Sequence, residues 1–491
     1  MLLLTIPVAC ASLTTQIETN LYANPDQTGI RWGLVVADIS GEELVALKPD
    51  DRFTPASNAK IATSMAGFQW LETLETDTLA PGLTAYLEEG ENSEIPDLVL
   101  FGGGDALIGD GPNCAAYCLA TLADQIVAAG ATEIGDIVGD DSLFPNERWN
   151  PGWSQEDLQY PYGTAVSALT LNNNVVSLSV DPAESTSAPA RVTWNEGDEF
   201  YRVINETMTV GTELPYDIRI ERAPGSDTVR VYGTVPNDSA SVTYSLGIDN
   251  PALYAATRLK RLLEARGINV LGEARSRHRP LNLADFPADG ADNGDGAFKL
   301  ETTNRFTRTE TPLAALPPTP LKESLMRISR DSQNLHAELL LRRLGLIDGT
   351  GSTAHGIAKI ETLWSVAGIP DTGYAIHGGS GLSIYNRMTP RSMVRLLSYA
   401  TTQPWFEEWK STLPVAGIGG TLQGNFKGTI LEGNLFAKTG TLNGVNALSG
   451  YMITASGREL VFSIIANDRP ARTPSALLER DAALLEIAAA Y

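Results

Sequence analysis

A serine and a lysine three residues apart raise the question of what this sequence could catalyse. Ser57 and Lys60 lie in the stretch T-P-A-S-N-A-K-I-A-T-S, residues 54–64. On a helix, residues i and i+3 share a face, so the lysine amine can come within hydrogen-bonding reach of the serine hydroxyl. A serine hydroxyl is a poor nucleophile until a base removes its proton, and a lysine with a lowered pKa can act as that base. The same spacing also fits an exposed helix lysine beside a serine at a helix start.

Two further motifs favour the catalytic interpretation. Among the serines, only Ser332 begins S-x-N, with Asn334 as its third residue, and among the lysines only Lys438 begins K-T-G. The S-x-N motif lies between two predicted helices, and K-T-G lies on a predicted strand. The order S-x-x-K, S-x-N, K-T-G is the active-site set of serine acyl-transferases of the β-lactamase and penicillin-binding-protein superfamily. Three motifs together, each in the expected local structure, predict an enzyme of this kind.

The surroundings of the motifs resemble one branch of that superfamily, the class C low-molecular-mass penicillin-binding proteins. These are the D-alanyl-D-alanine carboxypeptidase/endopeptidases of the bacterial periplasm. The resemblance runs from about residue 32 to the C-terminus and is carried by F-G-G-G-D (101–105), G-S-G-L-S (379–383), L-P-V-A-G-I-G-G-T-L (413–422) and A-K-T-G-T-L-N-G-V-N-A-L-S-G-Y (437–451). It implies an α+β fold: a penicillin-binding (β-lactamase/transpeptidase-like) domain with an antiparallel sheet flanked by helices, plus mainly β inserted domains between the first and second motifs.

The resemblance also implies a role for each motif residue. Ser57 would attack the D-Ala carbonyl to form an acyl-enzyme, with Lys60 as the base. Asn334 would hold Lys60 and the substrate amide, while Ser332 and Lys438 would pass a proton to the leaving amine. The oxyanion hole would be formed by the backbone N–H groups of Ser57 and Thr441. The implied substrate-binding residues are Thr439, Gly440, Thr441 and Asp157, and Lys438 with Thr439 could bind the terminal carboxylate.

Two parts of the implied binding site depart from the family or leave alternatives. Asp157 lies in P-G-W-S-Q-E-D-L (151–158), which resembles a segment whose acidic residue contacts the side-chain amine of diaminopimelate. A solvated turn carboxylate is the alternative for this residue. Family members often carry Asp before G-S-G-L-S and a basic residue after it, where this chain has Gly378 and Ile384. Arg387 is the nearby candidate for carboxylate recognition by this loop.

The elements that must position these residues can be predicted from patterning. Alternating apolar residues predict a hairpin over 32–39 and 43–49. Thr54 as N-cap and Pro55 at the first helical position predict a helix over 55–71. The further predicted helices cover 251–267, 321–330, 334–345 and about 474–490, and three consecutive antiparallel strands are predicted at 433–442, 446–454 and 458–467.

These patterns and the resemblance divide the chain into parts. The predicted parts are a signal peptide over 1–11, a penicillin-binding catalytic domain over 12–72 and 310–491, an inserted domain II over 73–103 and 163–285, an inserted domain III over 104–162, and a linker over 286–309. The linker is predicted because residues 285–296 are polar and rich in glycine and aspartate.

The net charge and the N-terminal sequence limit the possible binding partners and the cellular location. A formal net charge of −23 and a pI near 4.6 argue against a nucleic-acid-binding surface, which needs clustered Lys and Arg. The stretch M-L-L-L-T-I-P-V-A-C-A-S is too short to span a bilayer and ends in the small-x-small pattern of an export signal. We therefore expect export to the periplasm and no transmembrane segment in the mature chain. A lipoprotein that uses Cys10 is the weaker alternative.

No metal or cofactor is predicted. The histidines, at positions 278, 336, 355 and 377, lack metal-ligand spacing. Cys114 and Cys118 lie four residues apart, which favours a local disulfide or a free structural pair over a metal site.

The function that we predict is a periplasmic serine DD-peptidase, a D-Ala-D-Ala carboxypeptidase and/or an endopeptidase that cleaves peptidoglycan cross-links. Its expected partners are peptidoglycan stem peptides, with β-lactam antibiotics as covalent inhibitors. A β-lactamase on the same fold is one alternative, although residues 365–373 offer no glutamate of the kind that activates the deacylating water in class A enzymes. A catalytically silent cell-wall-binding protein is the other.

Overall fold

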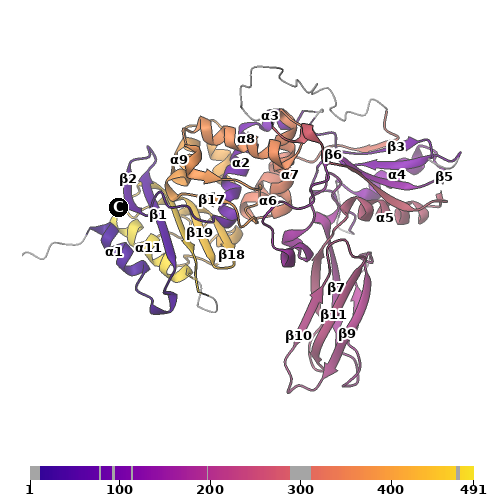
Figure 1. Cartoon of the computed structure of the whole chain (residues 1–491), viewed down its shortest axis with the longest axis horizontal. Coiled ribbons are helices and arrows are strands. Elements are labelled where there is room, and N and C mark those ends of the chain that lie inside the picture. The colour runs from indigo at the N-terminus through magenta and orange to yellow at the C-terminus, as the bar shows by residue number, and fades with distance from the viewer. Residues whose placement is uncertain are drawn as a thin grey trace, which may run out of the picture. The chain divides into compact units, whose positions relative to one another are not determined.

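The structure is a computed structural model that describes residues 12–76, 79–90, 94–111, 114, 116–195, 197–287, 311–470 and 476–491 (Figure 1). The predicted signal peptide, 1–11, and residues 288–309 of the predicted linker lie outside the described residues. The chain forms two compact units. The first is made from Met1–Gln69, Leu325–Gln333 and Lys359–Tyr491, and the second from Trp70–Ser324 and Asn334–Ala358. The predicted division of the inserted part into domains II and III stays a prediction.

The first unit is built on a five-stranded antiparallel sheet in the order β18-β19-β20-β1-β2. Its strands are β1 (Arg31–Asp38), β2 (Glu43–Leu47), β18 (Leu435–Leu442), β19 (Val445–Ile453) and β20 (Glu459–Asn467). The predicted hairpin and the three predicted C-terminal strands are thus confirmed. Strand β1 pairs with β20, with Leu34 opposite Ile464, so the two ends of the chain share one sheet. In Figure 1 the indigo strand β1 accordingly lies with the yellow strands of the C-terminal part.

Helices cover both faces of this sheet, as the sequence predicts. Side chains alternate between the two faces of a strand, and Trp32 and Leu34 of β1 belong to a buried apolar cluster with α1 (Leu13–Leu21) and α11 (Leu477–Ala490). Gly33 faces the other way, where a β-carbon would collide with Phe53 and with Pro390, the first residue of α9 (Pro390–Thr401). Helices α1 and α11 therefore pack on one face, and α9 packs on the other.

The remaining elements of the first unit are short. They are η1 (Pro25–Gln27), η2 (Ala56–Asn58), α2 (Ala59–Gln69), η7 (Asp371–Gly373), β16 (Tyr374–Ala375), β17 (Arg387–Met388), α10 (Phe406–Ser411) and η8 (Gly420–Leu422). Three longer helices follow one another in the chain, and their residues are divided between the two units: α6 (Leu321–Arg330), α7 (Asn334–Ile347) and α8 (Thr353–Val366). The predicted helices over 321–330 and 334–345 are confirmed by α6 and α7.

The second unit is mainly β, as predicted for the inserted part. Its largest sheet has five strands in the order β14-β6-β4-β3-β15, where β6 runs parallel to both β14 and β4. Two three-stranded sheets follow, in the orders β10-β11-β9 and β12-β7-β8, and β13 pairs with β5. The strands are β3 (Leu83–Glu88), β4 (Asp97–Phe101), β5 (Glu133–Ile134), β6 (Ile137–Pro145), β7 (Val175–Asp181), β8 (Arg191–Trp194), β9 (Arg202–Val210), β10 (Asp217–Glu221), β11 (Thr228–Pro236), β12 (Val242–Gly247), β13 (Asn269–Val270), β14 (Ala274–Arg279) and β15 (Ala314–Leu316).

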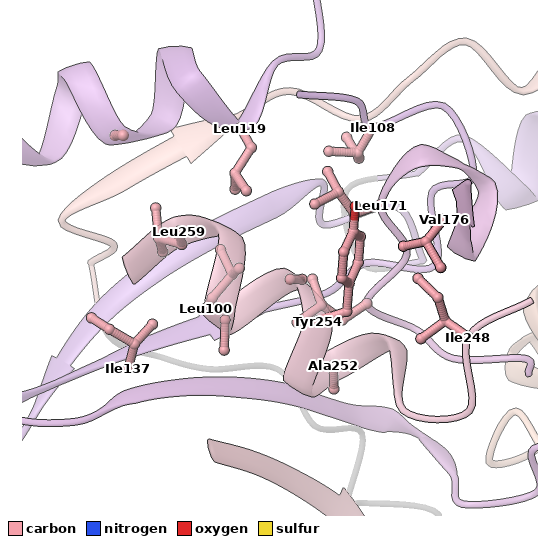
Figure 2. Close-up of a cluster of buried hydrophobic side chains, with 14 of the residues drawn as sticks. Leu100, Ile108, Leu119, Ile137, Leu171, Val176, Ile248, Ala252, Tyr254 and Leu259 are labelled. Atoms are coloured by element: carbon pink, nitrogen blue, oxygen red, sulfur yellow. The ribbon is translucent and has the colours of Figure 1, made fainter. Parts of the chain in front are cut away.

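Helices complete the second unit and its core. They are α3 (Leu71–Leu74), α4 (Leu119–Ala128) and α5 (Pro251–Glu264), with short turns η3 (Gln155–Gln159), η4 (Pro161–Gly163), η5 (Asn172–Asn174) and η6 (Leu283–Asp285). Helix α5 confirms the predicted helix over 251–267. Figure 2 shows how strands and helices contribute to one buried apolar cluster, with Leu100, Leu119, Ile137 and Leu259 among its members. Each fully buried leucine or isoleucine of such a cluster stabilises the fold by about 1.5–3 kcal/mol.

Cys114 and Cys118 form a disulfide in the second unit. Their Cα atoms lie 5.6 Å apart. Of the two possibilities that the spacing favoured, the structure therefore has the local disulfide. Cys118 directly precedes α4, so the bond closes the loop that leads into this helix.

Candidate active site

Ser57 lies in a short turn, one residue before a buried helix. It occupies the middle of η2, and α2 begins at Ala59. The predicted helix over 55–71 is therefore too long at its start, and Thr54 is not its N-cap. The Thr54 N–H instead donates to Asn467 Oδ1 at 2.7 Å, which ties the segment to β20. A contact between residues so far apart in sequence outweighs the local capping preference.

Lys60 is held inside the first unit with its amine at Ser57. Ten of the eleven residues of α2 are buried, and Lys60 itself is 0% exposed. Its Nζ lies 2.9 Å from Ser57 Oγ and 2.6 Å from the Ser380 carbonyl oxygen. Ser57 is half-buried, so an external group can reach its hydroxyl while the lysine stays covered. This arrangement places an amine where it can take the serine proton.

The turn that carries Ser57 is packed between a loop and a strand. Ala56 adopts a positive φ of 48°, a conformation that costs a non-glycine residue of order 1–3 kcal/mol. A β-carbon at Gly381 would collide with the Ala56 carbonyl oxygen, and one at Gly440 would lie 2.6 Å from the Pro55 carbonyl oxygen. The glycines of G-S-G-L-S and of K-T-G therefore make the room that this turn needs.

The second and third motifs meet at a serine and a lysine. Lys438 Nζ lies 2.8 Å from Ser332 Oγ and 3.0 Å from the Thr439 carbonyl oxygen. Ser332 follows α6 with a φ of 62°, so it ends this helix in the left-handed conformation common at helix C-termini. Lys438 is 1% exposed, and this burial lowers its pKa to about 7. An amine with that pKa can give or take a proton near neutral pH.

Strand β18 presents the K-T-G residues in two directions. Lys438 and Gly440 are buried, whereas Thr439 is half-buried and Thr441 is exposed. This alternation follows from the two-residue period of a strand. Because β18 is the first strand of its sheet, its outer edge has no neighbouring strand within that sheet. Thr439 and Thr441 are thus placed where a substrate could approach.

Two of the predicted site residues lie in the second unit. Asn334 is the first residue of α7, and its Nδ2 donates to the Tyr162 carbonyl oxygen at 2.8 Å. Asp157 lies in η3 and accepts a hydrogen bond from the Tyr162 hydroxyl at 3.0 Å. Burial, followed by this bond to Asp157, raises the pKa of Tyr162 above its ordinary value. Tyr162, which carries no motif signal, thus contacts both predicted residues.

Comparison with known proteins identifies the family. The family described as D-Ala-D-Ala carboxypeptidase 3 (S13) matches residues 13–285 and 295–491. The chain belongs to the S13 family. A D-alanyl-D-alanine carboxypeptidase of Actinomadura sp. (strain R39) is 33% identical over 487 residues, covering 96% of this S13 chain and 84% of that protein. The D-alanyl-D-alanine carboxypeptidase DacB of Haemophilus influenzae is 24% identical over 446 residues, covering 88% and 85%.

A solved structure confirms the fold. The crystal structure of penicillin binding protein 4 (dacB) from Haemophilus influenzae matches with a TM-score of 0.77 and 20% identity, covering 97% of this S13 chain and 98% of that one. The predicted α+β penicillin-binding fold and the class C low-molecular-mass assignment are therefore both confirmed.

The structure of this S13 protein also shows contacts that the motifs did not indicate. The guanidinium of Arg387, the candidate for carboxylate recognition, donates to Thr54 Oγ1 at 2.9 Å and to the Asn386 carbonyl oxygen at 2.8 Å. Its role toward a substrate stays a prediction. The Ser380 carbonyl that receives Lys60 lies in G-S-G-L-S, so the segment was recognised but this contact was not. Every residue has a backbone carbonyl, so the residue type does not indicate which carbonyl accepts a hydrogen bond. Only the fold reveals this contact.

The described residues of the S13 chain hold neither a metal-ligand cluster nor a membrane-spanning helix. No group of three or more His, Cys, Asp and Glu side chains is arranged there to hold a metal ion. Within the same residues, no helix has both the length and the apolar character that crossing a bilayer requires.

Proposed function

We propose that this S13 protein is a serine DD-peptidase that cleaves after D-Ala in peptidoglycan stem peptides. The observation that carries the proposal is the 2.9 Å distance between Lys60 Nζ and the half-buried Ser57 Oγ. A hydroxyl and a buried amine at this distance form the minimal pair for nucleophilic catalysis without a histidine. Family membership and the D-alanyl-D-alanine carboxypeptidases among its relatives supply the substrate class.

Acylation uses the two proton-carrying pairs in turn. Lys60 takes the Ser57 proton as Ser57 Oγ bonds to the carbonyl carbon of the penultimate D-Ala, or of the D-Ala in a peptide cross-link. The backbone N–H groups of Ser57 and Thr441 are the proposed donors to the oxyanion, each worth about 3 kcal/mol. The C–N bond then breaks, and Ser332 donates its proton to the leaving amine. Lys438 in turn donates a proton to Ser332. Water then hydrolyses the ester: Lys60 returns its proton to Ser57 Oγ, and the proton that the water loses restores Lys438.

The other predicted residues have supporting roles in the proposal. Asn334 holds the substrate amide, Thr439 binds the terminal carboxylate, and Gly440 keeps β18 close to the Ser57 turn. Asp157 recognises a side-chain amine at the third residue of the stem peptide. Asn334 and Asp157 belong to the second unit, and their roles are supported by the motif and by the family resemblance.

The proposed function also implies covalent inhibition by β-lactams and a location in the periplasm. A β-lactam presents a strained amide and a carboxylate, so it should acylate Ser57 as a substrate does. Export to the periplasm, with cleavage after Ala11, would place the enzyme where peptidoglycan lies. Mass spectrometry of the protein recovered from the periplasm tests this, since retention of residues 1–11 would contradict the proposed cleavage.

Covalent labelling by a fluorescent penicillin tests the nucleophile. The wild-type protein and a Ser411→Ala control should both take up the label, because Ser411 is an exposed serine of α10 in the same unit. Ser57→Ala should take up none. Full labelling of Ser57→Ala would overturn the proposal, and absence of label from the wild type would favour a catalytically silent cell-wall-binding protein.

Defined muropeptides distinguish the two activities. Loss of one D-Ala, detected by mass spectrometry, reports carboxypeptidase activity, and conversion of cross-linked dimers to monomers reports endopeptidase activity. Either product from the wild type, with neither from Ser57→Ala, supports the DD-peptidase. Rapid penicillin turnover without either product would instead indicate a β-lactamase.

A further inference from the structure

A threonine outside the three motifs contacts the K-T-G strand on its exposed side. Thr421 Oγ1 lies 2.7 Å from Thr439 Oγ1, and both residues belong to the first unit. Thr421 is exposed and Thr439 is half-buried, so the pair lies at the surface of this unit. The reaction proposed above uses Thr439 and gives Thr421 no role.

The number of hydroxyl protons determines how Thr421 and Thr439 can bind an anion. A hydroxyl carries one proton and can accept through its lone pairs. In a bond between two hydroxyls, one gives up its proton, and the acceptor keeps its own proton for a third group. A carboxylate has no proton and needs a donor. Thr439 is therefore free to donate to a carboxylate only when Thr421 is the donor in the bond between them.

The turn that carries Thr421 is fastened to the strand that carries Thr439. Val415 forms an isolated antiparallel bridge with Phe436 of β18. Leu422, the residue after Thr421, is 0% exposed and belongs to the apolar cluster beneath the sheet. Thr421 is thus held on both sides, so its hydroxyl loses little freedom when it bonds to Thr439. Groups held in place in this way need less ordering when a ligand binds.

A cation lies along the same turn. The Arg330 side chain extends across Gly419 and Gly420, with Nη2 2.7 Å and Cγ 3.0 Å from where their β-carbons would stand. Arg330 is exposed and forms no ion pair within the part of the chain that the structure describes. In a chain with a net charge of −23, an unpaired guanidinium against the two glycines that precede Thr421 favours an anion near this turn.

We propose that Thr421 is a positioning residue for the substrate carboxylate. It donates to Thr439 Oγ1 and thereby turns the Thr439 proton toward the free carboxylate of the terminal D-Ala. Consecutive hydrogen bonds polarise one another, so the Thr439 hydroxyl becomes a better donor than it would be alone. This inference rests on the proposed function, because it concerns the substrate of that site.

The test compares a penicillin that has its carboxylate with one that lacks it. Second-order acylation rate constants are measured by mass spectrometry for benzylpenicillin and for its methyl ester. The variants are Thr421→Val, which removes the hydroxyl at nearly constant shape, and Thr421→Ser, which keeps it. Thr429→Val is the matched control, because its hydroxyl donates to the Phe426 carbonyl oxygen in the same segment and contacts no motif residue.

The expected result is a lower acylation rate with benzylpenicillin and a nearly unchanged rate with its methyl ester. Thr421→Val should lower the rate with benzylpenicillin by about three- to tenfold, the usual effect of one hydrogen bond between neutral groups, and change the rate with the ester by less than about twofold. Thr421→Ser and Thr429→Val should keep the wild-type ratio of acid to ester rates. Equal losses for acid and ester, or no loss, would overturn the role of Thr421 and leave the proposed function intact. Absence of acylation of the wild type would overturn the proposed function itself.

Discussion

Lys438 Nζ and Ser332 Oγ lie 2.8 Å apart although 106 residues separate them in the chain. The contact joins an edge strand of the sheet to the residue that ends α6. It supplies a hydroxyl and an amine as a second proton-carrying pair, in addition to the pair of Ser57 and Lys60. Because Lys438 is buried, its ammonium form is disfavoured, and its pKa falls to about 7.

This lowered pKa predicts a pH-dependent difference in stability between the wild type and Lys438→Met. Unfolding restores the lysine to its ordinary value of about 10.5, so between about pH 7 and pH 10.5 the unfolded chain binds more protons than the folded chain. The free energy of unfolding of the wild type should therefore rise with pH in this window, relative to the variant, by about 1.4 kcal/mol per pH unit. Below about pH 7 the difference should be constant.

Urea unfolding of both proteins at several pH values from 6 to 9.5 measures this difference. The slope belongs to Lys438 alone, because every other titrating group is common to the two proteins. A difference that stays flat over the whole range would show that the lysine is charged equally in the folded and unfolded chains.

A buried polar network predicts the effect of changes behind the nucleophile. Asn58 Nδ2 donates to Ser449 Oγ at 2.7 Å, and Ser449 Oγ donates to Ser463 Oγ at 2.9 Å. All three side chains are 0% exposed. Ser449→Ala should destabilise the protein by about 1–3 kcal/mol, because it leaves the Asn58 amide without this acceptor. Since Asn58 adjoins Ser57, penicillin acylation should also slow.

Ser463→Ala is the matched control for this network. It leaves the bond between Asn58 and Ser449 in place, so its effect on thermal stability should be smaller and acylation should stay near the wild-type rate. Equal effects of the two variants on acylation would show that the network does not position the nucleophile.

The close approach of β18 to the Ser57 turn predicts the effect of a single methyl group. Gly440→Ala would place a β-carbon 2.6 Å from the Pro55 carbonyl oxygen, closer than real contacts allow. The turn or the strand must shift, so we expect penicillin acylation to fall by about tenfold or more, as small misplacements of reacting groups do. Gly424→Ala, where a β-carbon meets nothing within 4 Å, should acylate at the wild-type rate. Normal acylation of Gly440→Ala would contradict the proposed fit.

The proposed specificity of Asp157 predicts a selective change in peptide hydrolysis. With a substrate that carries a free side-chain amine at its third residue, Asp157→Asn should lower kcat/KM about 10- to 100-fold, because a hydrogen bond to a charged group is lost. With the acetylated substrate, kcat/KM should stay constant. The neighbouring exposed carboxylate of Glu156 provides the control, Glu156→Gln, which should leave both substrates unaffected. A similar loss with both substrates would assign Asp157 a structural role, for example in holding Tyr162.

Residue order along the chain was enough to predict the family, the class of reaction and most of the elements around the site. Three short motifs were enough for this because each lies within a single element or turn, where local pattern and side-chain chemistry are visible in residue order. The strand predicted over 433–442 and the helix predicted over 334–345 are observed as β18 and α7 for the same reason.

The contacts that bring the motif residues together become visible only in the folded chain. Local pattern favoured a helix starting near Pro55, but the bond from Thr54 to Asn467 and the glycines facing Ala56 and Pro55 hold Ser57 in a separate turn. The bond from Lys60 to a backbone carbonyl and the pairing of Thr421 with Thr439 were equally absent from the pattern. Such contacts depend on how distant segments pack, and periodicity along the chain reports only which face of an element is apolar.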